Sequence, residues 1–121
     1  MEFLHFSGFN VHPGKNREFQ AWVRANSAAL AKAMPEGNEL VGIYASIFGS
    51  EKHSGGYKMI FRLDSYGAMD QFAAAVNSNA ELARLMNELY SFADQRIGSD
   101  YSIELLKSVA DTSIWADFPE E

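Results

Sequence analysis

The chain has 121 residues, a length that suits one domain with a buried core and is short for two. Its content of 47% hydrophobic and 21% charged residues is that of a globular protein, with no apolar run long enough for a membrane helix. The net charge of −6 and the scattered Lys and Arg disfavour nucleic acid as a partner, because a phosphate backbone would be repelled. Without Cys or a signal-peptide pattern, a cytoplasmic protein is expected.

The first two predicted elements are a strand and a long helix. Residues 3–11, FLHFSGFNV, alternate between two faces as a strand does, and both faces carry apolar side chains. After HPGK, apolar residues recur at helical spacing up to Met34. This pattern predicts an amphipathic helix with Pro13 in its first turn and Trp22 packed into the core.

Two further strands are predicted next, joined as a hairpin. PEGN ends the helix, and residues 39–49 form a strand pattern that is apolar on both faces. Residues 50–56 are polar and glycine-rich, and they are few enough for a hairpin connection. The third strand, residues 57–64, is therefore expected to pair antiparallel with the second.

A second helical region is predicted after the third strand. Asp64 or Ser65 is expected to cap a helix that extends to Val76. Ser78 followed by Glu81 is a capping-box pattern, which predicts that a new helix starts there.

The carboxyl-terminal part is predicted to contain one more strand and a tail. GSD closes the second helical region, and residues 101–110 alternate as a fourth strand. Residues 112–121 have no periodicity, but they contain Trp115 and Phe118. We expect this tail to pack on the body of the domain or on a partner subunit.

The order strand, helix, strand, strand, helix, strand is that of the ferredoxin-like α+β fold. It predicts a single domain over residues 1–111, with a four-stranded antiparallel sheet and both helices on one face. The other face would also carry large apolar side chains, and so much exposed apolar area is unusual for a monomer. A homodimer with two-fold symmetry is therefore expected.

The strand FLHFSGFNVHPGK leading into EFQAWV, and the later LDSYGAMDQFAAAVNSNAELARLMNEL, resemble the dimeric α+β barrel superfamily over about residues 3–110. Its members include antibiotic-biosynthesis monooxygenases, haem-degrading monooxygenases, muconolactone isomerases and stress-responsive barrel proteins. The resemblance implies two sheets packed face to face and a small ligand between sheet and helices or inside the barrel. The haem-degrading branch uses an axial histidine in the second helical region, and no histidine follows His53 here. Haem is therefore not expected, and no cofactor is predicted.

Candidate site residues depend on which way each strand faces. If Leu4, Phe6 and Phe61 meet the helices, the opposite face gathers a polar set consisting of His5, Ser7, Tyr44, Ser46, Lys58, Arg62, Glu104 and Ser108. His5 could then act as a general base, with Glu104 orienting its ring and Arg62 holding an oxyanion. The predicted ligand-binding residues are Ser7, Tyr44, Lys58 and Tyr66, the last at the helix entry.

A structural interpretation competes with this one. His5 can be a hydrogen-bonded interface residue, and Arg62 with Glu104 an ion pair across the sheet. His12 and His53 fall in polar connections, and the spacing of the three histidines is not that of a metal site. Two functions remain open. One is a homodimer that binds a small apolar or aromatic metabolite, as a cofactor-independent monooxygenase or isomerase; the other is a non-catalytic dimeric interaction or stress-response module.

Overall fold

The computed structural model describes residues 2–49, 56–96 and 101–109, so the predicted tail and His53 lie outside the described residues. The elements in chain order are strand β1 (Phe3–Phe9), helix α1 (Asn16–Lys32), strand β2 (Asn38–Ala45), strand β3 (Tyr57–Leu63), helix α2 (Ala68–Ser78), helix α3 (Ala80–Phe92) and strand β4 (Tyr101–Lys107). The predicted order is confirmed, including the break that divides the second helical region into two helices.

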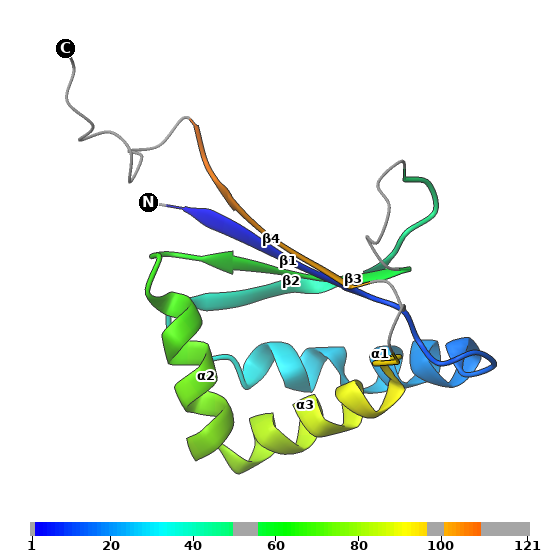
Figure 1. Cartoon of the computed structure of the whole chain (residues 1–121). Coiled ribbons are helices and arrows are strands. Elements are labelled where there is room, and N and C mark those ends of the chain that lie inside the picture. Colours follow the sequence, from blue (N-terminus) through cyan, green and yellow to red (C-terminus); the bar gives the residue numbers. More distant parts are fainter. Residues whose placement is uncertain (1, 50–55, 97–100, 110–121) are drawn as a thin grey trace.

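The four strands form one antiparallel sheet in the order β2-β3-β1-β4. All three helices lie on one side of this sheet, and the other side is left without a helical layer (Figure 1). This two-layer arrangement is the predicted ferredoxin-like α+β fold. We call the side without helices the open face of the sheet and the opposite side the helix face.

The pairing of β1 with β3 decides which side chains of β1 face the helices. Phe3 lies opposite Leu63, and His5 lies opposite Phe61. Directly opposed residues share a face, and Phe61 and Leu63 are buried in the core. His5 therefore lies on the helix face, together with Ser7, and the predicted facing of β1 is wrong. The error has a physical cause, since β1 is apolar on both faces and its alternation alone cannot distinguish them.

Strand β2 contains a bulge that also alters the predicted facing. Its register against β3 shifts between Leu40 and Gly42, which leaves Val41 as an extra residue. Leu40 lies opposite Phe61 and is buried in the core. Beyond the bulge, Ile43 packs against the core and Tyr44 lies opposite Lys58 on the open face, as predicted.

The core lies between the helix face and the three helices, and its centre is aromatic. Phe19 of α1 is fully buried, and its ring makes edge-to-face contacts with Tyr57 at 4.8 Å and Phe92 at 5.5 Å between centroids. Trp22 stacks on Phe19 at 6.4 Å and is partly buried, which confirms its predicted packing role. These contacts hold α1 and α3 against the middle of the sheet.

The helix starts differ from those predicted. Helix α1 starts at Asn16, which leaves Pro13 in the preceding turn, and α2 starts after Gly67 without a side-chain cap. The cap of α3 is Asn79, whose side-chain oxygen accepts hydrogen bonds from the backbone N–H groups of Glu81 and Leu82. The backbone of Asn79 is extended, as a capping residue requires, whereas Ser78 still belongs to α2.

Glycine is required in the turn that leads into β2. Gly37 has a φ of +88°, and a Cβ there would come within 2.8 Å of a carboxylate oxygen of Asp64. The backbone N–H of Asp64 also donates a hydrogen bond to the carbonyl of Gly37. A residue without a side chain therefore lets the ends of β2 and β3 meet.

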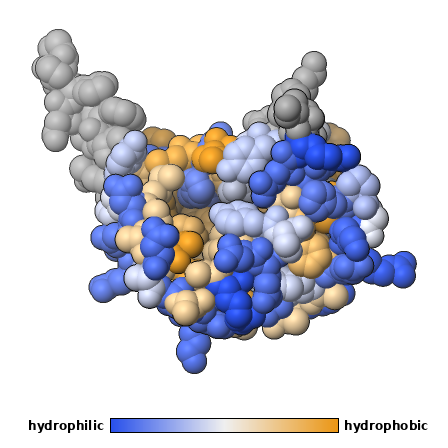
Figure 2. Space-filling view, turned by 60° about the horizontal axis from the view of Figure 1, so that its bottom comes forward, coloured by the Kyte–Doolittle hydropathy of each residue, from blue (hydrophilic) through white to orange (hydrophobic). Residues whose placement is uncertain are grey.

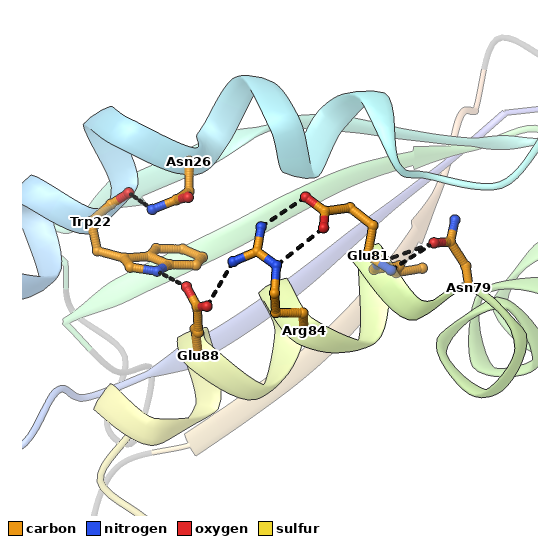
Figure 3. Close-up of polar contacts among 7 residues, drawn as sticks. Trp22, Asn26, Asn79, Glu81, Arg84 and Glu88 are labelled. Carbon is orange, nitrogen blue, oxygen red and sulfur yellow. Dashed lines mark hydrogen bonds and ion pairs between the residues drawn. The ribbon is translucent and has the colours of Figure 1, made fainter.

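Polar side chains connect α1 and α3 on the outer side of the helical layer. The indole N–H of Trp22 donates a 2.8 Å hydrogen bond to Glu88, and Arg84 pairs with both Glu88 and Glu81 (Figure 3).

In Figure 2, hydrophilic side chains interspersed with smaller apolar areas occupy the side of the molecule brought forward from the bottom of Figure 1. In the described part of the chain, no helix has the length and apolar character needed to cross a membrane.

Candidate functional site

A cavity of about 580 Å³ lies between the helix face and the carboxyl-terminal end of α3. Its lining is formed by Ser7, Phe9, Met59, Leu89, Tyr90, Ala93, Asp94, Gln95, Arg96 and Tyr101, and we call it the α3 cavity. The volume is within the range of roughly 300–1,000 Å³ that is usual for small-molecule sites. Most of the lining is apolar, which is also typical of such sites.

The sheet supplies the floor of the α3 cavity. Phe9 and Met59 are buried side chains of β1 and β3, and Ser7 lies directly opposite Met59 on the same face. The Ser7 hydroxyl is thus a polar group in an otherwise apolar floor. The short side chain of Ser7 leaves space beside Phe9, the next residue of β1 on the same face.

Two tyrosines stand at the wall of the cavity. Tyr90, near the end of α3, is 50% exposed, and Tyr101, at the start of β4, is 60% exposed. Burial raises the pKa of the Tyr90 phenol, and the nearby Tyr101 phenol adds to the rise because two phenolates would repel each other. Tyr90 therefore stays protonated and can both donate and accept hydrogen bonds.

The segment after α3 forms a charged corner of the cavity. Asp94 is buried, and its carboxylate accepts hydrogen bonds from Arg96 through the guanidinium Nε at 2.9 Å, Nη2 at 2.7 Å and the backbone N–H at 3.1 Å. These bonds lower the pKa of Asp94 to about 2. His12 adds a weaker attraction, with its Nδ1 3.9 Å from the same carboxylate.

This corner is anchored to the end of β1 through the backbone. The N–H of Asp94 donates to the carbonyl of Asn10 at 2.7 Å, and the N–H of His12 donates to the carbonyl of Phe92 at 3.0 Å. Val11 and Ala93 form an isolated bridge between these bonds. The wall of the cavity is therefore fixed to its floor by main-chain pairing, which preorganises the site.

The chemistry of the lining favours binding over proton transfer. A general base works best with a pKa near the operating pH, and the Asp94 carboxylate is a very weak base because Arg96 stabilises its charged form. Tyr90 has the opposite shift and keeps its proton. The cavity offers hydroxyl groups, aromatic rings and an ion pair, Asp94–Arg96, whose charges neutralise each other. This lining suits an uncharged ligand with an aromatic ring.

The structure brings one predicted site residue, Ser7, into the α3 cavity. His5 is two residues earlier on the same face of β1, but it lines a separate and smaller pocket. Tyr66 is 62% exposed and packs edge-to-face on Phe3 at 6.1 Å, outside the lining of the α3 cavity. Their expected roles in binding or catalysis stay predictions.

Four of the remaining predicted residues lie on the open face, away from His5. Lys58 and Arg62 alternate with the buried residues of β3, Tyr44 lies opposite Lys58, and Glu104 lies opposite Phe6. His5 is on the other side of the sheet, so the predicted patch of His5, Arg62 and Glu104 does not form. The reason is again the two-sided apolar pattern of β1.

Arg62 also has partners other than the one predicted. Its guanidinium donates hydrogen bonds to Glu39 at 2.9 Å and to Glu2 at 2.7 Å, and these bonds raise the pKa of Arg62. The partners come from the strand ends that flank β3. Arg62 is therefore part of an exposed ion-pair network at one end of the sheet.

The residues that sequence reasoning missed are Tyr90, Asp94, Arg96 and Tyr101. A weak signal exists in the polar sequence DQR, which directly follows the apolar stripe of α3. Tyr101 also lies opposite Phe9 in the sheet, but only the pairing of β1 with β4 makes this visible. Among the described residues, no group of three or more His, Asp or Glu side chains is arranged to hold a metal ion.

Comparison with solved structures identifies the fold of this chain. No family model matches the sequence, and no curated protein is similar to it at a significant level. A solved NIPSNAP family protein from Agrobacterium tumefaciens is similar in structure with a TM-score of 0.65 and 11% identity, covering 88% of this chain and 92% of the other. A NIPSNAP-like domain protein from Burkholderia xenovorans also has a TM-score of 0.65, at 10% identity, covering 93% and 89% of the two chains.

A candidate antibiotic biosynthesis monooxygenase from Caulobacter crescentus has a TM-score of 0.59 and 19% identity, covering 89% of this chain and 90% of the other. The chain shares its ferredoxin-like α+β fold with these proteins. At the level of the fold, this agrees with the resemblance seen in the sequence. At these identities the likeness establishes the fold, on which many chemistries occur.

Proposed function

We propose that this protein binds a small apolar or aromatic metabolite in the α3 cavity and that it does so as a homodimer. The observation that carries the binding proposal is the α3 cavity itself, which combines a volume of about 580 Å³ with an apolar floor and a few hydroxyl groups. The anchoring of its wall to β1 supports a site that is formed before the ligand arrives.

The lining favours an aromatic ligand that carries a hydroxyl group. Tyr90 and Tyr101 offer ring faces and edges, and Met59 offers a polarizable thioether to an aromatic body. The Ser7 hydroxyl and the Tyr90 phenol can each exchange a hydrogen bond with a ligand hydroxyl. Because Asp94 already neutralises Arg96, the cavity has little net attraction for a strongly charged ligand.

Direct binding of 1-naphthol, a fluorescent phenol, tests the proposal. We expect saturable binding to the wild-type chain, and Tyr101→Ala should weaken it roughly 2- to 10-fold, the equivalent of ~0.5–1.5 kcal/mol for an aromatic pair. Tyr66→Ala is the matched control because it removes a similarly exposed tyrosine outside the α3 cavity. Equal losses in the two variants, or no saturable binding to wild type, would contradict the proposal.

Oxygen uptake in the same samples tests the monooxygenase interpretation. A phenol can supply all the electrons itself, since 1-naphthol and O₂ give 1,4-naphthoquinone and water without any external reductant. The comparison with solved structures includes candidate antibiotic biosynthesis monooxygenases, which is why this reaction is tested first. Quinone formation that requires the protein and is lost in Tyr90→Phe would extend the function from binding to oxygenation.

The homodimer is supported by the open face. Side chains that would be unusual on a free surface point away from the helices there, among them Leu4, Phe6, Tyr44, Ile60 and Leu106. Tyr44 is 50% exposed and Leu106 is 41% exposed in the single chain. An apolar sheet face of this kind is stabilised when a second copy covers it with two-fold symmetry.

A non-catalytic dimeric interaction or stress-response module is the second candidate. The observation in its favour is that Asp94 and Tyr90 in the α3 cavity are both poor general bases at neutral pH. A stable dimer that neither binds nor oxidises 1-naphthol would favour this function. Arg62→Met should then change dimer dissociation, since Arg62 binds two carboxylates at one end of the sheet.

A further inference from the structure

A second, smaller cavity lies at the other end of the helix face. It has a volume of about 80 Å³ and is lined by His5, Asn38, Phe61, Leu63, Met69 and Phe72, and we call it the His5 pocket. Its lining residues come from β1, the start of β2, the end of β3 and the beginning of α2. The His5 pocket shares no lining residue with the α3 cavity, so its use is independent of the function proposed above.

His5, a lining residue of this pocket, carries an unpaired polar atom. Its Nε2 is buried and has no hydrogen-bond partner, and it is the only buried side-chain nitrogen or oxygen in this state among the described residues. Leaving such an atom unpaired is unfavourable, because the hydrogen bond it made to water in the unfolded chain is not replaced. A ligand that forms a hydrogen bond with Nε2 would remove this unfavourable contribution on binding. The pocket should therefore bind a ligand with a polar group more tightly than a purely apolar one.

Asn38 adds a second polar group with a defined orientation. Its side-chain nitrogen donates a 3.0 Å hydrogen bond to the carbonyl of Ala68, which fixes the amide and leaves its oxygen as an acceptor. The remaining lining residues are apolar, and the Phe61 ring lies 5.8 Å from the imidazole of His5. The pocket is thus a small apolar space with two neutral polar side chains.

Burial also keeps the imidazole uncharged. It lowers the pKa of His5 below the ordinary value of 6.5, because desolvation disfavours the charged form. A neutral ring has one accepting and one donating nitrogen. A hydroxyl group can both donate and accept, so it satisfies Nε2 in either tautomer.

We propose that the His5 pocket is a binding site for a small uncharged hydroxyl compound, or for the hydroxyl-bearing end of a larger one, whose hydroxyl group bonds to His5 Nε2. Its volume corresponds to roughly two or three water molecules at the liquid volume of ~30 Å³ each, enough for an alcohol of a few carbons. Ordered water is a less favourable occupant than an alcohol, because each water molecule needs two to four polar partners and the lining has only two polar side chains. An alkyl group instead buries its apolar surface against Phe61, Leu63 and Phe72.

Met69 belongs both to the pocket and to the surface of the molecule. It lines the pocket and is also 38% exposed, and its side chain is flexible. Its methyl group is therefore a natural reporter of occupancy, and it is present in every variant used below.

The experiment is an NMR titration with 2-propanol as the probe. In the wild-type chain we expect saturable shifts of the Met69 methyl signal and of the His5 Nε2 signal. His5→Phe should weaken the saturable Met69 shift at least tenfold or abolish it. His12→Phe is the matched control, since it removes a partly exposed histidine remote from this pocket, and it should bind 2-propanol like wild type.

Two results would overturn the proposal. One is a linear, non-saturating response of both signals in the wild-type chain, which needs no variant and so remains decisive if His5→Phe does not fold. The other is an unchanged 2-propanol affinity in a folded His5→Phe, because the imidazole would then play no part in recognition. Neither result bears on 1-naphthol binding in the α3 cavity.

Discussion

Trp22 of α1 donates its indole N–H to the carboxylate of Glu88 on α3, over a distance of 2.8 Å. This bond joins the two helices, and it is the largest of the influences that lower the pKa of Glu88. Arg84 contributes as well, while Glu81 acts in the opposite direction through charge repulsion. The pair therefore links helix packing to the ionisation of one surface carboxyl group.

Replacement of Trp22 should change both the packing of α1 on α3 and the pKa of Glu88. In Trp22→Phe we expect the pKa of Glu88 to rise towards its ordinary value and the Tm to fall, because a helix–helix hydrogen bond is lost. Carboxyl chemical shifts followed by NMR during an acid titration measure the pKa. Glu81→Gln is the control with the opposite sign, and a rise of the Glu88 pKa in that variant would contradict this account.

Phe19 should be among the most sensitive core positions. It is fully buried and contacts the rings of Phe9, Tyr57 and Phe92. Phe19→Ala leaves a cavity in this cluster and should lower the free energy of unfolding by about 3–5 kcal/mol, as measured by urea denaturation. Ile47→Ala, at a side chain that is 99% exposed, should change it by less than about 0.5 kcal/mol.

The buried imidazole of His5 should make stability depend on pH. Its pKa is lower in the folded chain than the ordinary 6.5 of the unfolded chain, so the unfolded chain binds more protons between the two values. Stability from this group is complete above about pH 6.5 and is lost as the pH falls towards the folded pKa. Unfolding free energies measured across this window should show a slope that disappears in His5→Phe and persists in His12→Phe.

Protonation of Asp94 should cause a similar loss of folding stability at lower pH. Its pKa is about 2 in the folded chain against an ordinary value of 3.8, because Arg96 stabilises the carboxylate. The stabilisation is present above about pH 4 and is lost as the pH falls through about 2. Asp94→Asn should flatten the acid limb of a Tm-against-pH curve, and an unchanged acid limb in this variant would contradict the account.

A charge placed on the open face should separate the proposed dimer. Phe6 lies on that face opposite Ile60 and Glu104, so Phe6→Glu would put a carboxylate within a covered apolar surface. We expect a monomer by analytical ultracentrifugation at concentrations where wild type is dimeric. Ala25→Glu adds the same charge at an exposed position of α1 and should remain dimeric. A dimeric Phe6→Glu would place the interface elsewhere.

The sequence predicted the fold through features that are local. Alternation in residues 57–64 separates Lys58 and Arg62 from the buried Met59 and Phe61, and helical spacing places Phe19 and Trp22 on one stripe. The order of these elements then leaves few possible arrangements, and the ferredoxin-like sheet is one of them. Strand existence, helix periodicity and sheet order were accordingly predictable.

The facing of β1 was decided only by the tertiary structure. Phe3 and Phe9 alternate with Leu4 and Phe6, so either face could be buried, and a difference of one residue exchanges them. Pairing with β3 settles the choice because Phe3 comes opposite Leu63 and must share its buried face. Because His5 shares a face with Phe3, it also lies on the helix face, on the opposite side of the sheet from Arg62 and Glu104.

By itself, then, the sequence determined the elements, their order and the fold, since periodicity and turn chemistry act over a few neighbouring residues. Only the tertiary structure reveals the α3 cavity, because Ser7 of β1 is far along the chain from Tyr90 of α3 and Tyr101 of β4. It also decided that His5 lies in a pocket of its own. Both sites depend on strand register and helix docking, which are set by packing over the whole core and leave no local pattern in the sequence.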